Sequence, residues 1–138
     1  MVGQLLAITA LFCLSFTSMA SDLIGARSAK FATIEVNGLS EHSDDFAKRI
    51  CADFKLHPRQ VIFFFKRAKE IDSRTFTHDR YSPCYARGTV IFSDGTQGTW
   101  EIHSGKTALL TLEDGTGKIL YCQQCRWKDP FEGGYSPH

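Results

Sequence analysis

Alternating apolar and polar residues run through the C-terminal half of the chain in four short stretches. A period of two is typical of a strand with one buried face, so each stretch predicts a strand. Asp-Gly or Ser-Gly pairs separate the stretches, and such pairs favour tight hairpin turns. These links are too short for parallel crossovers, so the four stretches predict an antiparallel meander. The predicted strands are residues 86–93, 98–103, 106–113 and 117–122.

The alternation also predicts which face of this meander is dry. One face carries apolar side chains, and the other carries mainly threonine, charged and ring side chains. The predicted dry face holds Val90, Phe92, Trp100, Ile102, Ala108, Leu110 and Leu112. The predicted wet face holds Thr89, Ile91, Thr99, Glu101, His103 and Thr111. A sheet of this kind needs a covering layer on its dry face.

Residues 44–54 have the apolar spacing of a helix. Phe46, Ile50 and Phe54 recur every four residues and predict one buried face. Cys51 lies on the same side, so its thiol is predicted to point inward. Ser43 precedes the first turn and is the predicted N-cap.

Residues 58–71 predict a second helix, which begins at Pro58. Its apolar face holds Val61, Phe64, Phe65, Ala68 and Ile71. An alternating stretch at residues 31–36, ended by a turn signal at 37–38, predicts a further strand. The sequence therefore predicts an α+β fold. Two helices pack on one face of a four- to five-stranded antiparallel meander that disulfides staple.

The first twenty residues have the pattern of a secretory signal. None is charged, most of residues 5–16 are apolar, and Ser18 and Ala20 provide the small residues of a cleavage site. The apolar run is short for a bilayer span. We therefore predict a signal peptide at 1–20, a single domain at 21–138, and a periplasmic or secreted protein with no membrane insertion after cleavage. Residues 126–138 predict a loosely ordered tail, held at best by Trp127 and Phe131.

Four cysteines remain after the predicted cleavage, and an even count in an exported chain predicts disulfides. They are Cys51, Cys84, Cys122 and Cys125. Four antiparallel strands return Cys84 and the Cys122–Cys125 stretch to one end of the sheet. One arrangement is therefore a clasp from Cys84 to Cys122 or Cys125, with Cys51 bonded to the remaining thiol. The alternative joins Cys122 to Cys125 and Cys51 to Cys84, and the spacing leaves both arrangements open.

The overall charge nearly balances, with 16 basic and 15 acidic side chains and a net charge of +1. A near-neutral chain disfavours a dedicated nucleic-acid binder, whose affinity comes from neutralising phosphates. Basic residues are concentrated in residues 48–87. We interpret this stretch as solvated helix faces, with contact to an acidic partner as the alternative.

A redox centre and a metal centre each have weak support in the sequence. Cys122 and Cys125 follow a strand, whereas a redox pair needs a thiol whose pKa is lowered, usually at a helix N-terminus. A zinc site would need two more ligands, and Cys51 and Cys84 come singly. The histidines are scattered, with no two spaced for one metal on a helix. We therefore predict no metal and no cofactor.

Nucleophile sets have equally weak support. A Cys–His pair would combine Cys84 with His78 or His103, and a Ser–His–Asp set would combine Ser82, His78 and Asp79. Neither has a local signature of a nucleophile beside its base. The sequence therefore favours a protein without catalytic residues.

Three short motifs resemble those of a group of exported bacterial proteins with a helix followed by a meander. The motifs are Ser82-Pro83-Cys84-Tyr85, Asp94-Gly95 with Trp100-Glu101-Ile102, and Leu120-Tyr121-Cys122 with Cys125. The likeness covers about residues 54–125. It implies a bacterial periplasm and brings no activity and no functional residues with it.

We predict that the chain is a non-enzymatic binding module of the bacterial cell envelope, such as an inhibitor or immunity-type protein. Its partner would be an envelope or secreted protein, bound through the wet face of the sheet or the loop at residues 72–85. The candidate binding residues are His78, Tyr81, Tyr85, Glu101 and His103. The alternative is a periplasmic thiol-disulfide oxidoreductase or chaperone that uses Cys122 and Cys125.

Overall fold

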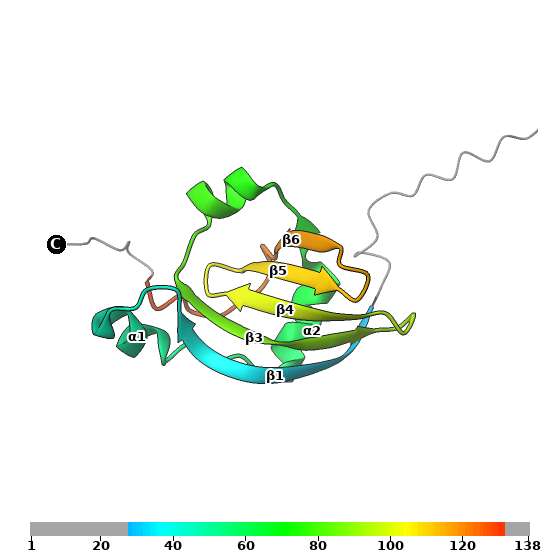
Figure 1. Cartoon of the computed structure of the whole chain (residues 1–138), viewed down its shortest axis with the longest axis horizontal. Helices are drawn as coiled ribbons and strands as arrows, with labels where there is room; N and C mark the ends of the chain where they lie inside the picture. Colours follow the sequence, from blue (N-terminus) through cyan, green and yellow to red (C-terminus); the bar gives the residue numbers. More distant parts are fainter. Residues whose placement is uncertain (1–27, 132–138) are drawn as a thin grey trace, which may run out of the picture.

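Six antiparallel strands form one curved sheet, and a helix crosses one of its faces (Figure 1). The computed structural model describes residues 28–131, so the predicted signal peptide and the end of the predicted tail lie outside the described residues. The strands are β1 (Ala29–Ser40), β2 (Lys69–Glu70), β3 (Cys84–Phe92), β4 (Gln97–His103), β5 (Thr107–Leu112) and β6 (Gly117–Tyr121). The helices are α1 (Asp45–Cys51), α2 (Pro58–Arg67) and the π-helix η1 (Thr75–Asp79). The α+β class is confirmed, with one more helix and one more strand than predicted.

Strands β3 to β6 form the predicted meander, in the sheet order β1-β3-β4-β5-β6-β2. The predicted dry face is confirmed, because Val90, Trp100 and Leu110 are each about 1 % exposed. Gly95 and Gly115 have φ values of 84° and 85°, so the Asp-Gly pairs supply the left-handed backbone that these hairpins need. The wet face carries a cross-strand row of threonines in register, Thr33, Thr89, Thr99 and Thr111.

Strand β1 is longer than the sequence predicts, because Asn37 and Gly38 do not end it. Gly38 has a φ of 66° and lies where the β1–β3 register shifts, which marks a bulge within the strand. The Asn37 side chain donates to the Leu56 carbonyl at 3.2 Å and accepts from the Leu56 amide at 3.0 Å. The Asn37-Gly38 pair, which predicted a turn, therefore forms a bulge within β1, and the Asn37 side chain attaches this strand to the segment before α2.

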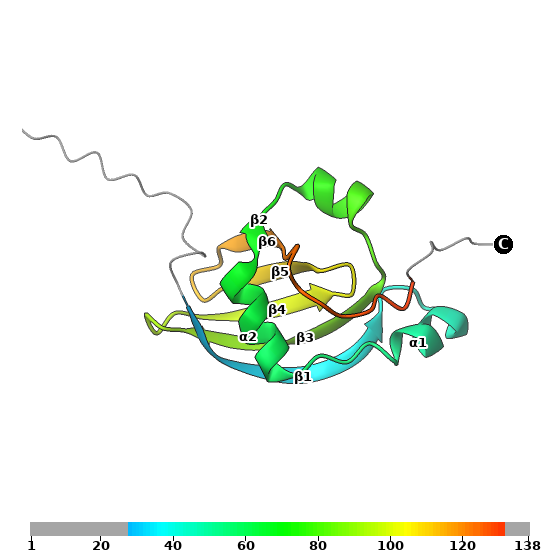
Figure 2. The same cartoon turned by 180° about the vertical axis from the view of Figure 1, so that it is seen from behind.

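Helix α2 covers the dry face and runs from the β1 edge to the β2–β6 edge (Figure 2). Val61, Phe64 and Phe65 are fully buried, as the spacing predicts. The predicted extension to residue 71 is wrong. Ala68 leaves the helical conformation, β2 pairs with β6, and the Ile71 amide donates to the Ile119 carbonyl at 2.9 Å. The backbone groups of residues 69–71 thus pair with the open edge of β6 instead of continuing the hydrogen bonds of the helix.

Helix α1 lies beside one end of the sheet rather than over its face (Figures 1 and 2). The prediction that Phe46 faces the core is wrong, since Phe46 is 56 % exposed while Ala47 and Cys51 are buried. The N-cap is Asp44 instead of Ser43, and its carboxylate accepts from the Ala47 amide at 2.8 Å. The helix ends before Phe54, which is buried from an irregular segment. None of the helices among residues 28–131 is long and apolar enough to cross a membrane.

The disulfides follow the second of the two arrangements left open by the sequence. Cys51 bonds to Cys84 and joins the end of α1 to the start of β3, while Cys122 bonds to Cys125. The other arrangement, a clasp from Cys84 to Cys122 or Cys125, is not formed. The two sites do share one end of the sheet, but β3 and β6 are separated by β4 and β5. Three strand spacings amount to roughly 14 Å, well beyond the reach of a disulfide.

The two disulfides close loops of very different length, which predicts unequal contributions to stability. Replacing Cys51 and Cys84 by alanine removes a constraint across 33 residues and should lower the free energy of unfolding by about 3–4 kcal/mol. The matched replacement of Cys122 and Cys125, which are three residues apart, should cost about 2 kcal/mol. Urea unfolding of the two double variants measures both values. A larger loss for the Cys122–Cys125 variant would contradict this account.

Gly88 in the centre of β3 allows close packing on both sides. A Cβ atom there would overlap the Thr33 carbonyl oxygen of β1 and the ring of Trp100, whose Nε1 donates to the Thr89 carbonyl at 2.9 Å. Gly88→Ala should therefore lower the free energy of unfolding by about 1–3 kcal/mol in urea titrations. Gly117→Ala, where a Cβ meets no atom within 4 Å, should change it by about 0.5 kcal/mol or less.

Candidate functional site

His103 ends β4 on the wet face of the sheet, yet it is fully buried. The Tyr85 ring stacks on its imidazole at 5.4 Å, and the Phe76 ring of η1 packs edge-on at 5.4 Å. The prediction that the wet face is exposed to solvent is therefore wrong at His103. The alternation correctly identifies the face, but η1, which covers His103, has no signal in the sequence.

The imidazole of His103 is oriented by two hydrogen-bond partners. Its Nδ1 lies 2.9 Å from the Ser82 carbonyl oxygen, and a carbonyl can only accept, so Nδ1 carries a proton. Its Nε2 lies 2.9 Å from Glu101 Oε1 and 3.8 Å from Glu41 Oε1. Burial lowers the pKa of His103, but its bonds to Glu101 and Ser82 and the charges of Glu41 and Glu101 outweigh this effect and raise the pKa above its usual value. The protonated imidazole then donates from Nε2 to Glu101.

Glu41 joins this cluster from the segment that follows β1. Its amide donates to the Pro83 carbonyl at 2.9 Å, which holds the residue beside the start of β3. Its Oε2 accepts from the Tyr81 hydroxyl at 2.8 Å. Partial burial, together with the hydrogen bond to Glu41 and the charge of Glu41, raises the pKa of Tyr81 to about 12. Tyr81 is therefore a hydrogen-bond donor throughout the neutral range.

Four of the five predicted binding residues come together in this cluster, namely Tyr81, Tyr85, Glu101 and His103. The fifth, His78, is exposed on η1. Glu41 was not among the predicted residues, because its place depends on the unexpected length of β1. Within residues 28–131, Glu41, Glu101 and His103 form the one group of three potential metal-ligating side chains whose ligand atoms lie within 4.8 Å of one another. We name these three residues the carboxylate–histidine cluster.

The candidate nucleophile sets are not assembled. The Cys84 sulfur is bonded to Cys51 and is not available to His78 or His103. The Ser82 hydroxyl is buried and contacts the Ser104 hydroxyl at 2.5 Å and the Asp129 carboxylate at 3.2 Å. Both serines thus hold the C-terminal segment in place, since Ser104 also donates to Asp129 at 2.8 Å.

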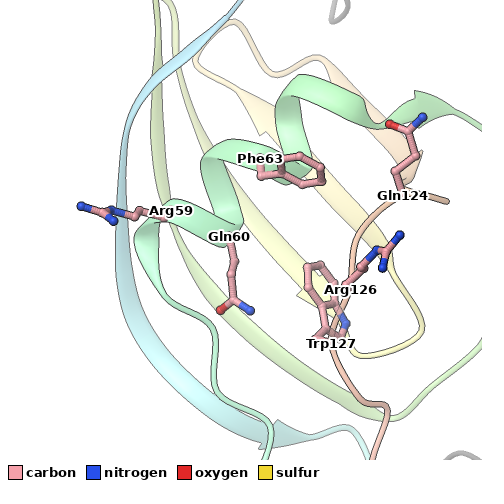
Figure 3. A pocket seen from close by; sticks show the side chains of 6 residues that line it. All are labelled: Arg59, Gln60, Phe63, Gln124, Arg126 and Trp127. Atoms are coloured by element: carbon pink, nitrogen blue, oxygen red, sulfur yellow. The ribbon is translucent and has the colours of Figure 1, made fainter.

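A groove of about 280 Å³ lies on the other side of the sheet, between α2 and the segment after β6 (Figure 3). Phe63 projects from α2 toward this segment and is 41 % exposed. We call this the α2 groove. It is lined by Arg59, Gln60, Phe63, Gln124, Arg126 and Trp127.

The wall of the α2 groove is fixed by the core rather than by a regular element. The Trp127 ring stacks on Phe64 at 6.3 Å and packs against Phe54 at 6.2 Å. Its Nε1 donates to the Ser104 carbonyl at 3.0 Å. Trp127 is therefore a preformed part of the groove, and the Cys122–Cys125 disulfide holds the chain just before it.

The charge around the α2 groove is positive. Arg59 and Arg126 are among the lining residues, and none of the lining residues is acidic. Lys66 and Arg67 occupy the last turn of α2, with the Arg67 guanidinium 5.9 Å from the centre of the Phe63 ring. The basic stretch at residues 48–87 thus places part of its charge beside an exposed aromatic ring, a combination suited to an acidic partner.

Comparisons with known proteins return no match. No family model, curated protein or solved structure matches this chain. The resemblance to short exported bacterial proteins therefore stays a prediction, and a function for the chain has to be argued from its own residues.

The raised pKa of His103 predicts how stability depends on pH. A native pKa above the unfolded value of about 6.5 favours the folded state below that pH, and this contribution is lost as the pH rises through the native pKa. Nuclear magnetic resonance titration in the presence of a chelator should show His103 titrating above pH 6.5. Glu101→Gln should lower that midpoint, whereas Glu35→Gln on the exposed side of β1 should leave it in place. Equal midpoints in all three proteins would contradict this arrangement.

Proposed function

We propose that this chain is an exported, non-enzymatic binding module that recognises an acidic segment of another envelope or secreted protein. The observation that carries the proposal is the α2 groove, where an exposed aromatic ring is flanked by arginines and no lining residue is acidic. The two disulfides are consistent with an oxidising compartment. An inhibitor or immunity-type protein is one role that such a module would serve.

The groove favours a segment that combines one apolar side chain with carboxylates. Phe63 and Trp127 provide ring surface, which contributes binding energy when a partner covers it. Arg126 stands beside them and can hold a carboxylate with two parallel hydrogen bonds (Figure 3). Since Trp127 is already packed against Phe54 and Phe64, little side-chain ordering is needed on binding.

The oxidoreductase alternative has less support. Reactive cysteines lie in partly exposed, electropositive surroundings, because a thiolate has to reach the disulfide sulfur. Cys122 and Cys125 are 0 % and 2 % exposed, so a substrate thiol would have to open the structure first. This burial supports a structural disulfide that anchors the wall of the groove.

Short synthetic peptides that alternate aspartate with leucine or phenylalanine test the proposal, with lysine-for-aspartate versions as the charge control. Fluorescence anisotropy should show binding of the acidic peptides alone. Arg126→Glu and Phe63→Ser should each weaken binding by roughly tenfold, because they remove the charge and the ring surface of the groove. Lys48→Glu makes the same charge change on exposed α1 and should have little effect.

Two results would count against this function. One is equal affinity for the acidic and basic peptides. The other is an affinity that Arg126→Glu and Phe63→Ser leave unchanged. Vesicles with and without anionic lipid are a further comparison, since arginines beside an aromatic ring also bind lipid headgroups. Binding to anionic vesicles that Arg126→Glu abolishes, without peptide binding, would replace the protein partner by a membrane surface.

A further inference from the structure

We propose that the carboxylate–histidine cluster binds a divalent transition-metal ion, with Zn²⁺ as the best-fitting ion. Glu41, from the segment after β1, and Glu101 and His103, both from β4, supply two carboxylate oxygens and one imidazole nitrogen. The cluster lies on the opposite face of the sheet from the α2 groove, so this proposal is independent of the proposed binding function.

The distances within the cluster match those between ligands of one ion. Zinc binds nitrogen and carboxylate oxygen at about 2.0–2.2 Å, which places neighbouring tetrahedral ligands roughly 3.3 Å apart. His103 Nε2 lies 2.9 Å from Glu101 Oε1 and 3.8 Å from Glu41 Oε1. These values lie on either side of the ideal separation, so small side-chain rotations suffice to enclose an ion.

The orientation of His103 presents the correct atom to that ion. Because Nδ1–H donates to the Ser82 carbonyl, a neutral imidazole has its lone pair on Nε2. Nε2 is also the atom that faces both carboxylates. Without a positive charge between them, a lone pair and a carboxylate oxygen at 2.9 Å repel each other. That charge is either a proton on Nε2 or a metal ion in its place.

Additional hydrogen bonds hold two of the three ligand side chains in place, as is common around metal sites. The Ser82 carbonyl fixes the ring of His103, and the Tyr81 hydroxyl donates to Glu41 Oε2 at 2.8 Å, which leaves Oε1 directed toward Nε2. Tyr85 and Phe76 pack around the imidazole and restrict its rotation. The site is thus organised before an ion arrives.

The cluster is also open to ions from one side. The His103 side chain is 1 % exposed, whereas those of Glu101 and Glu41 are 28 % and 36 % exposed, so an ion would enter past the carboxylates. Two carboxylates balance the charge of a divalent cation. An imidazole ligand favours zinc over magnesium and calcium, which prefer all-oxygen sites.

Isothermal titration calorimetry on the purified, chelator-treated protein with Zn²⁺ tests the proposal. The wild-type chain should bind one ion in this cluster, while Mg²⁺ and Ca²⁺ should bind far more weakly. Glu41→Gln and Glu101→Gln each remove a ligand from a partly exposed position and should weaken binding by about 100-fold or more. Tyr81→Phe removes only the supporting hydroxyl and should weaken it by about tenfold.

Controls separate this site from surface binding and from damage to the fold. Glu35→Gln and Arg126→Glu should retain wild-type affinity for Zn²⁺, and thermal unfolding of the metal-free variants should confirm that each is folded. Visible absorption of the Co²⁺-loaded protein reports the ligand set and should change in Glu41→Gln and Glu101→Gln. Absence of Zn²⁺ binding would overturn the proposal, as would an affinity that Glu41→Gln and Glu101→Gln leave unchanged, which would mean an adventitious ion only.

Discussion

The packing of α2 across the dry face of the sheet is the contact on which the rest of the structure depends. Phe64 and Phe65 insert between α2 and strands whose inward side chains, Trp100 and Leu110 among them, are also buried. Burial of this apolar surface is the main favourable term in folding. The helix starts near the β1 edge and ends where β2 pairs with β6, so the same packing sets both edges of the sheet. Phe64 then provides the surface against which Trp127 stacks, and with it the wall of the α2 groove.

The two candidate sites lie on opposite faces of the sheet and depend on different elements. The α2 groove exists because the helix is apolar on one side and basic on the other, and because the segment after β6 folds back beside it. The carboxylate–histidine cluster exists because η1 covers the far face at one end of the sheet. There, Phe76 and Tyr85 cover the imidazole of His103, and its hydrogen bond to Glu101 fixes the orientation of the ring. One site therefore offers apolar and charged groups that would suit a protein partner, and the other is small enough for a single ion.

The local pattern of apolar and polar residues correctly predicted the elements whose burial depends mainly on neighbouring residues in the sequence. The period of two placed Val90, Trp100 and Leu110 on the buried face, and the Asp-Gly pairs placed the hairpins. The same reasoning failed for α1. The spacing predicts an apolar helical face, but α1 lies beside the end of the sheet (Figure 1), and Phe46 on it is 56 % exposed. It failed again at Asn37, whose turn propensity was overridden when its side chain bonded both backbone groups of Leu56.

The sequence by itself determined the α+β class, the meander, its dry face and the presence of enough cysteines for two disulfides. These features depend on local propensity and on the alternation of apolar residues, which act over a few residues. Only the tertiary structure decided the pairing of Cys51 with Cys84, the burial of His103 and the approach of Glu41 to Glu101. Each of these joins residues far apart in the chain. Such contacts depend on how the strands and helices are arranged in space, so no short-range pattern encodes them.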